Sequence, residues 1–305
     1  MNAKNNHTYR RLNRYRRWVQ ALSLLLFVAV PVLNGSGIHA IVGTLYSISI
    51  GELDMADPVM VLQTILLTRE IYLPLLLAAV VPVVIAWLFG RVFCSWVCPQ
   101  NTLSEWIDAV QQRFFPKRWK REHHFKFGRN PSAVWYWLIF TALLLITVIL
   151  GLPLLSYVSA PGIITSFLSQ AILGLGVGAE IVLVLAIFAI EAALFRRFWC
   201  KYACPVGAGL ALFQGRRSLR VQFNTEMCDC KPGTAPCYAV CPLHLAPKEI
   251  ETLYPYCFNC GLCVAFCENA GHALTFGFGA AGSQGGASRN FEKKPFQLIQ
   301  VSRHK

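Results

Sequence analysis

The sequence predicts an all-helical membrane protein, a duplicated hairpin of four transmembrane helices, with a small α+β cysteine-rich domain on the cytoplasmic side. Three observations lead to this prediction. First, 55% of the 305 residues are hydrophobic and the mean hydropathy is +0.47, which is more apolar than most soluble domains. Second, a CxxxCP motif occurs twice, each time after a long apolar segment. Third, the other eight of the twelve cysteines lie between residues 228 and 267.

Four segments are apolar and long enough, or nearly so, to cross a bilayer, whose core of about 30 Å requires roughly 20 helical residues. They are residues 18–33, 72–89, 134–155 and 176–195. Lys and Arg are dense before the first segment, between the second and third, and after the fourth. The connections 34–71 and 156–175 contain no Lys and a single Arg, Arg69. Because cytoplasmic loops are enriched in Lys and Arg, we expect a multi-pass membrane protein with both termini in the cytoplasm.

The formal net charge of +13 does not indicate a nucleic-acid partner. The basic residues flank apolar segments instead of lining one soluble face, which is typical of membrane proteins. In the first outer connection, Asp57-Pro58 precedes an apolar run and predicts a short helix on the outer face.

The two CxxxCP motifs belong to an internal repeat. Phe89-Gly-Arg-Val-Phe-Cys94-x3-Cys98-Pro99 aligns with Phe195-Arg-Arg-Phe-Trp-Cys200-x3-Cys204-Pro205, and two predicted helices precede each motif. Cysteines four apart share one face of a helix, so we expect the four sulfurs of Cys94, Cys98, Cys200 and Cys204 to meet near a pseudo-twofold axis. The spacing leaves open a further cluster or metal, redox-active dithiols, and simple packing of small residues.

The remaining eight cysteines form two runs. Cys257-x2-Cys260-x2-Cys263-x3-Cys267 has the ligand spacing of a bacterial ferredoxin, and Cys228, Cys230, Cys237 and Cys241-Pro242 form an irregular second run upstream. In two-cluster ferredoxins the fourth cysteine of each run binds the other cluster. We therefore predict one [4Fe–4S] cluster on Cys228, Cys230, Cys237 and Cys267, and a second on Cys241, Cys257, Cys260 and Cys263. Zinc is the alternative, but zinc sites usually use well-separated CxxC pairs.

These features divide the chain into four regions. They are a basic cytoplasmic N-terminus (1–17), a four-helix membrane domain (18–215), a two-cluster ferredoxin-like domain (216–276) and a Gly/Ala/Ser-rich tail (277–305). Within the fourth apolar segment Glu191 is an ionisable group inside the membrane, which makes it a candidate proton acceptor. The alternative is an ion pair with Arg91 or Arg197.

The assembled motifs resemble the NapH type of membrane ferredoxin subunit, in a wider group with the NosR, MauN and FixG types. The resemblance rests on Asp57-Pro58-x4-Gln63, Phe93-Cys-Ser-Trp-Val-Cys-Pro99, Trp199-Cys-x3-Cys-Pro-Val-Gly207 and the two-cluster tail. It implies oxidation of membrane menaquinol or ubiquinol and electron flow towards a periplasmic ferredoxin-like partner and a terminal reductase of the nitrate reductase type. A FixG-like maturation factor, which reduces copper or thiols for the assembly of another redox enzyme, is the alternative.

Overall fold

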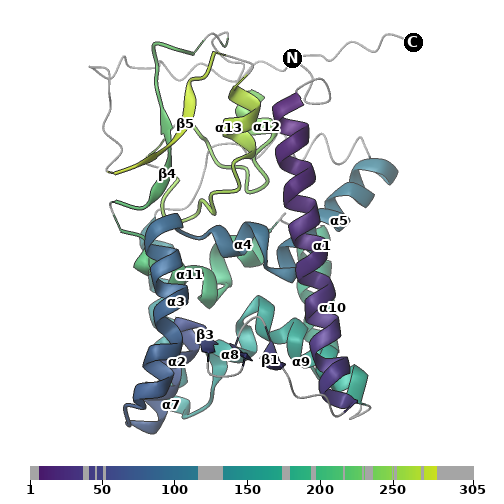
Figure 1. Cartoon of the computed structure of the whole chain (residues 1–305), viewed down its shortest axis with the longest axis vertical. Coiled ribbons are helices and arrows are strands. Elements are labelled where there is room, and N and C mark those ends of the chain that lie inside the picture. Colours follow the sequence, from purple (N-terminus) through teal and green to yellow (C-terminus); the bar gives the residue numbers. More distant parts are fainter. Residues whose placement is uncertain are drawn as a thin grey trace.

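The computed structural model describes most of the chain in two units, a helical unit (7–215) and a cysteine-rich unit (217–279) at one end of it (Figure 1). The described residues are 7–36, 41–44, 47–50, 53–115, 133–173, 179–193, 197–215, 217–228, 230, 236–248, 250, 253–268 and 271–279. The predicted tail therefore lies outside them beyond residue 279.

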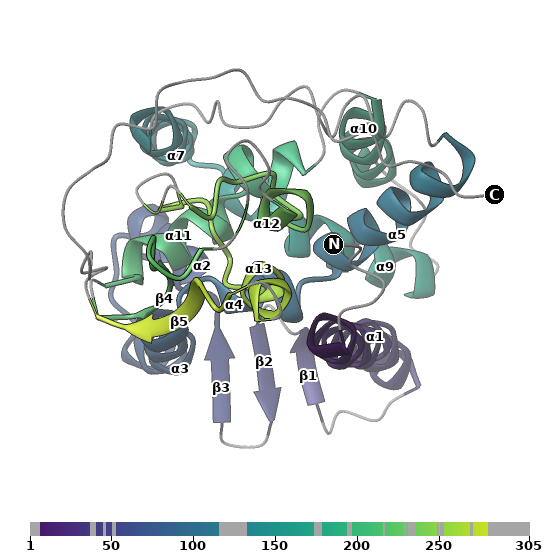
Figure 2. The same cartoon turned by 90° about the horizontal axis from the view of Figure 1, so that it is seen from above.

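Four helices stand at the corners of the helical unit when it is seen from above (Figure 2). They are α1 (His7–Gly35), α3 (Leu73–Phe89), α7 (Ala133–Leu150) and α10 (Ala179–Ala193). Each overlaps one of the four predicted apolar segments, although α1 begins well before Trp18 and includes much of the predicted basic N-terminus. Among the described residues, α1 and α7 are long and apolar enough to cross a membrane, whereas α3 and α10 are shorter.

Shorter helices fill the space between the corner helices. These are α2 (Pro58–Thr68), α4 (Val92–Trp96), α5 (Pro99–Phe114), α8 (Leu154–Val158), α9 (Ala160–Leu173), the π-helical turn η2 (Trp199–Ala203) and α11 (Pro205–Phe213). The helix predicted after Asp57 is present as α2, but Val59 and Gln63 are buried, so it packs inside the unit. The order is similar in the two halves, because α2, α3, α4 and α5 correspond to α9, α10, η2 and α11.

A three-stranded antiparallel sheet connects α1 to α2, and the all-helical prediction missed it. Its strands are β1 (Ile41–Thr44), β2 (Ser47–Ile50) and β3 (Leu53–Ala56), in the order β1-β2-β3. Strands of four residues are too short to give a clear two-residue periodicity, so the sequence pattern does not distinguish them from a loop.

The cysteine-rich unit is α+β, as predicted. Strands β4 (Leu219–Phe223) and β5 (Leu274–Phe278) pair antiparallel, and the short helices α12 (Pro236–Ala239) and α13 (Leu262–Cys267) lie beside them. The first turn of α1 also reaches this unit, where the Tyr9 ring packs edge-on against Phe266 with centroids 5.9 Å apart. Helix α1 therefore contributes to both units.

Candidate metal centres

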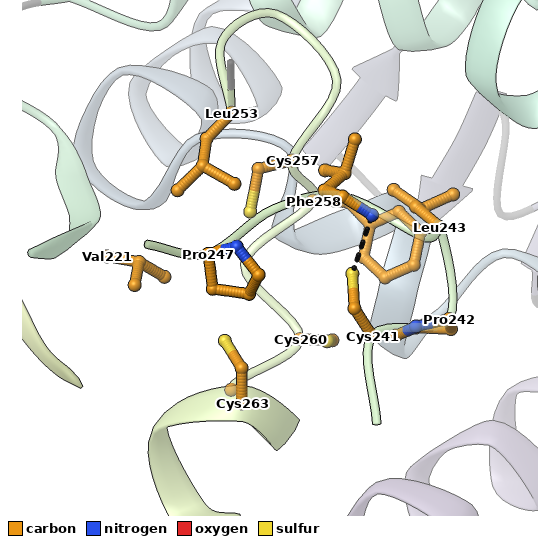
Figure 3. A pocket seen from close by; sticks show the side chains of 12 residues that line it. Val221, Cys241, Pro242, Leu243, Pro247, Leu253, Cys257, Phe258, Cys260 and Cys263 are labelled. Atoms are coloured by element: carbon orange, nitrogen blue, oxygen red, sulfur yellow. Dashed lines mark hydrogen bonds between the residues drawn. The ribbon is translucent and has the colours of Figure 1, made fainter. Parts of the chain in front are cut away.

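The first of two cysteine-lined cavities lies in the cysteine-rich unit beside the helical unit. Its cysteines are Cys241, Cys257, Cys260 and Cys263, and we call it the Cys260 cavity (Figure 3). Two loops and the first turn of α13 supply these residues. Gly261 makes the sharp turn into α13. Its φ of +77° is a backbone angle that residues other than glycine rarely adopt. The lining is otherwise apolar, including Val221, Leu253 and Phe258.

The second cavity is lined by Cys228, Cys230, Cys237 and Cys267, and we call it the Cys230 cavity. Phe223, Phe266 and Lys248 complete much of its wall. Cys267 belongs to the downstream run in sequence but lines the Cys230 cavity with the upstream cysteines. Cys241 belongs to the upstream run but lines the Cys260 cavity with the downstream cysteines. Each cavity is thus lined by four cysteines, three from one run and one from the other.

The chemistry of both cavities suits four-iron clusters. Burial raises the pKa of Cys257 and of Cys237 to about 12 each, so these thiols need a bound cation to ionise at neutral pH. The backbone N–H of Leu245 donates to the Cys241 sulfur at 3.4 Å. Among the described residues no three His, Cys, Asp or Glu side chains converge closely enough for a single metal ion. A cubane suits the wider spacing, because each cysteine binds a different iron.

The CxxxCP motifs differ from the prediction in local structure. Cys94 lies in α4 and Cys200 in η2, but Cys98 and Cys204 are extended residues that precede α5 and α11. The prediction of two cysteines on one helix face was wrong, because a following proline disfavours the helical conformation. The Cys204 sulfur still lies within electrostatic reach of the sulfurs of Cys94, Cys98 and Cys200.

The two motifs contact each other in an equivalent way. The Arg197 guanidinium donates to Asn101 Oδ1 at 2.8 Å. Arg91, which aligns with Arg197, passes over Gly207, where a Cβ atom would lie 2.2 Å from the Arg91 Nη2 atom. Asn101 and Gly207 each lie two residues after the motif proline. Each arginine therefore packs against the same position of the opposite motif.

Replacing Gly207 with alanine is expected to displace Arg91 and to destabilise the protein by about 1–3 kcal/mol, the usual cost of overpacking a buried site. Arg91 is fully buried and hydrogen-bonded, so its guanidinium has little room to move. Thermal unfolding of purified protein in detergent would measure the loss. Leu212→Ala, on the exposed face of the same helix, is the control, and equal melting temperatures for the two variants would contradict the prediction.

Glu191 is buried between α10 and α5 with an incomplete set of partners. Its Oε2 atom accepts hydrogen bonds from Ser104 Oγ at 2.5 Å and Gln100 Nε2 at 3.5 Å. Its Oε1 atom has no hydrogen-bond partner among the described residues. None of the ion pairs among these residues includes Glu191, so they contain no pairing with Arg91 or Arg197, which was the alternative interpretation.

A buried charge network beside Glu191 was not predicted from the sequence. Glu105 on α5 lies 2.6 Å from Arg16 on α1 and 3.6 Å from Arg197. Asp108, one turn further along α5, lies 3.6 Å from Arg197 as well. Glu105 and Asp108 lie between the second and third predicted apolar segments, where only the positive charges were interpreted. The i, i+3 spacing of two acids after a cysteine motif was the available signal.

The protein has two buried four-cysteine cavities in an α+β unit that packs against apolar helices. These features define an iron–sulfur electron-transfer protein of the ferredoxin type. A family model described as a 4Fe-4S binding domain matches residues 72–122 and 177–222, and each matched segment contains one CxxxCP motif.

Curated relatives agree with this class. The ferredoxin-type protein NapH of Escherichia coli (strain K12) is 25% identical over 272 residues, which cover 85% of this chain and 88% of NapH. The methylamine utilization ferredoxin-type protein MauN of Paracoccus denitrificans (strain Pd 1222) is 30% identical over 231 residues, 74% of each chain. No solved structure gives a significant match. The chain belongs to the family of ferredoxin-type proteins that includes NapH and MauN.

Proposed function

We propose that this protein is an inner-membrane subunit that oxidises menaquinol or ubiquinol and passes the electrons towards a periplasmic ferredoxin-like partner and a terminal reductase. In this proposal residues 18–215 form a duplicated hairpin of four transmembrane helices with cytoplasmic ends at both termini, and residues 216–276 form the two-cluster domain. Two [4Fe–4S] clusters, one in each cysteine cavity, would supply one-electron redox chemistry.

The outward faces of the corner helices support the membrane part of the proposal. Large apolar side chains are exposed on all four, and Leu25, Leu77, Ile149 and Leu185 each expose at least 61% of their surface. So many large exposed apolar side chains on a soluble protein would favour aggregation. A lipid environment covers it at no such cost.

The observation that carries the proposal is the contact between the Cys260 cavity and the helical unit. Ser95 Oγ, between the two cysteines of the first CxxxCP motif, donates to the Phe258 carbonyl at 2.9 Å. Phe258 lies between the cavity residues Cys257 and Cys260. A redox centre bound there would lie directly against the CxxxCP motifs, which is the position needed to exchange electrons with a donor in the membrane.

Glu191 is the proposed acceptor for a proton of the quinol. Quinol oxidation releases two protons with two electrons, so a site requires a base near the one-electron centre. Glu191 is 5% exposed, has an unpartnered carboxylate oxygen and lies within electrostatic reach of Cys200. Ser104 and Gln100 hold the other oxygen and so fix the orientation of the carboxylate.

To test the proposal, the protein is purified anaerobically, placed in lipid vesicles and treated with a menaquinol analogue. EPR then shows whether the clusters are reduced. Reduction of the clusters by quinol supports the proposal. Clusters that dithionite reduces but quinol does not would contradict it, and reduction of copper or protein thiols in the same preparation would favour the maturation factor.

Replacing Glu191 with glutamine is expected to slow quinol-dependent cluster reduction by roughly a hundredfold, the usual loss when a general base is removed. Glutamine keeps the hydrogen bond with Ser104 but cannot take a proton. The EPR spectrum after dithionite reduction should stay unchanged, because Glu191 holds no iron. Glu180→Gln, near the other end of α10, is the matched control. A larger loss of rate in that variant would contradict the assignment and would place the proton acceptor at that end of α10.

A further inference from the structure

Among the described residues, Arg91 carries a buried positive charge that has no carboxylate partner. Its side chain is 1% exposed, and none of the ion pairs among the described residues includes it. Nη1 donates to the Pro255 carbonyl at 2.7 Å and Nη2 donates to the Cys200 carbonyl at 3.2 Å. The Tyr136 ring lies 5.8 Å from the guanidinium carbon. The Cys94 thiol also lies beside the guanidinium, so the described neighbours are carbonyls, a ring and a thiol around a charge that is costly to bury unless an anion compensates it.

The equivalent arginine of the other motif is paired with acids. Arg197 lies 3.6 Å from Glu105 and 3.6 Å from Asp108, and it is as deeply buried as Arg91. The two arginines thus have the same place in the repeat and opposite electrostatic surroundings. What distinguishes Arg91 is its direction, because it points to the loop of the cysteine-rich unit that carries Cys257.

A second buried cation approaches the same cavity from the second motif. Lys201, between Cys200 and Cys204, is 7% exposed, and its Nζ atom donates to the Leu243 carbonyl at 3.2 Å. Leu243 lines the Cys260 cavity two residues after Cys241. Arg91 and Lys201 therefore hold the two loops that supply Cys241 and Cys257, one cation to each loop.

The Cys230 cavity is in a different position. The walls of both cavities come from the cysteine-rich unit, but the cation of the Cys230 cavity, Lys248, belongs to that unit too, whereas Arg91 and Lys201 belong to the helical unit. A four-iron cluster with four thiolate ligands is anionic, and a nearby fixed cation stabilises its reduced, more negative form. Net charge and hydrogen bonding are the main means by which a protein sets the potential of such a cluster.

We propose that Arg91 and Lys201 are positioning residues that fasten the Cys260 cavity to the helical unit and raise the reduction potential of the cluster bound there, making it the cluster that exchanges electrons with the helical unit. This inference rests on the proposed cluster binding. It assigns an order to the two centres, with the Cys260 cavity, which lies against the CxxxCP motifs, first and the Cys230 cavity second.

The test is an EPR-monitored redox titration with dithionite and mediators, without quinol, on anaerobically purified variants. The signals of the two clusters are assigned with Cys263→Ser and Cys237→Ser. In Arg91→Gln the signal of the Cys260-cavity cluster should move to a more negative potential, while that of the other cluster stays in place. Arg91→Lys, which keeps the charge, should retain most of the original potential.

Lys201→Gln should shift the same cluster in the same direction, and it provides the measurement if Arg91→Gln does not accumulate. Lys248→Gln is the matched control and should shift only the cluster of the Cys230 cavity. An unchanged potential in both Arg91→Gln and Lys201→Gln, or equal shifts of both clusters, would overturn the inference. Because these titrations use no quinol, failure of quinol to reduce the wild type would remove the proposed substrate and leave this result intact.

Discussion

Replacing Glu105 with glutamine is expected to destabilise the protein by about 3–5 kcal/mol, because it removes the carboxylate that compensates two buried arginines. Arg16 and Arg197 each expose 3% of their side chains, and Glu105 contacts both. Burial alone would raise the pKa of Glu105, yet Arg197 and Arg16 hold it below its ordinary value. In the variant Arg16 keeps no carboxylate partner among the described ion pairs, and Arg197 keeps only Asp108.

Thermal and denaturant unfolding in detergent would measure this effect. Glu70→Gln is the matched control, because Glu70 is exposed and its described hydrogen bonds are to its neighbours Thr68 and Tyr72. A double variant, Glu105→Gln with Arg16→Met, removes a cation together with its anion and should recover part of the lost stability. Equal stability of Glu105→Gln and the wild type would show that the network contributes nothing.

The same contact predicts a pH dependence. A carboxyl with a lowered pKa in the folded state contributes stability above its unfolded value, and that contribution is lost as the pH falls through the folded value. The difference between wild type and Glu105→Gln should therefore be complete near neutral pH and should shrink at acidic pH. A difference that grows on acidification would contradict the assignment.

Much of the fold follows from sequence patterns that reflect local physics. Long apolar segments became α1, α3, α7 and α10, because the length of a helix and its hydropathy are local properties. Proline at 99 and at 205 also determined where the CxxxCP motif bends, although the cysteine spacing alone suggested a continuous helix. The grouping of cysteines in the two cavities also has a local component, because three of the four residues in each set are close in sequence.

The parts that could not be predicted depend on long-range contacts. Arg91 reaches a carbonyl 164 residues away, and Glu191 meets Ser104 from 87 residues away. Sequence shows that such residues are unusual for an apolar stretch, but not which groups they will meet. Two arginines at the same place in the repeat, one paired with acids and one not, could be distinguished only in three dimensions.

Each cavity is lined by one cysteine from the other run, so neighbouring cysteines on α13 are expected to bind different clusters. Cys263 and Cys267 lie one turn apart on α13, yet they line different cavities. Cys263→Ser should remove the cluster of the Cys260 cavity, and Cys267→Ser should remove the other one. In each case the iron content should fall from about eight atoms per chain to about four, because serine replaces one thiolate ligand of one cluster.

EPR of the dithionite-reduced variants decides whether the two losses are different. Cys267→Ser should resemble Cys237→Ser, which lies 30 positions upstream and lines the same cavity, and it should differ from its neighbour in sequence, Cys263→Ser. A variant at Cys94 or Cys204 is the further comparison. Iron above about eight atoms per chain in the wild type, lowered by such a variant, would show that the CxxxCP cysteines bind a further cluster. If Cys263→Ser and Cys267→Ser lose the same EPR signal, the sets defined by the two cavities are wrong.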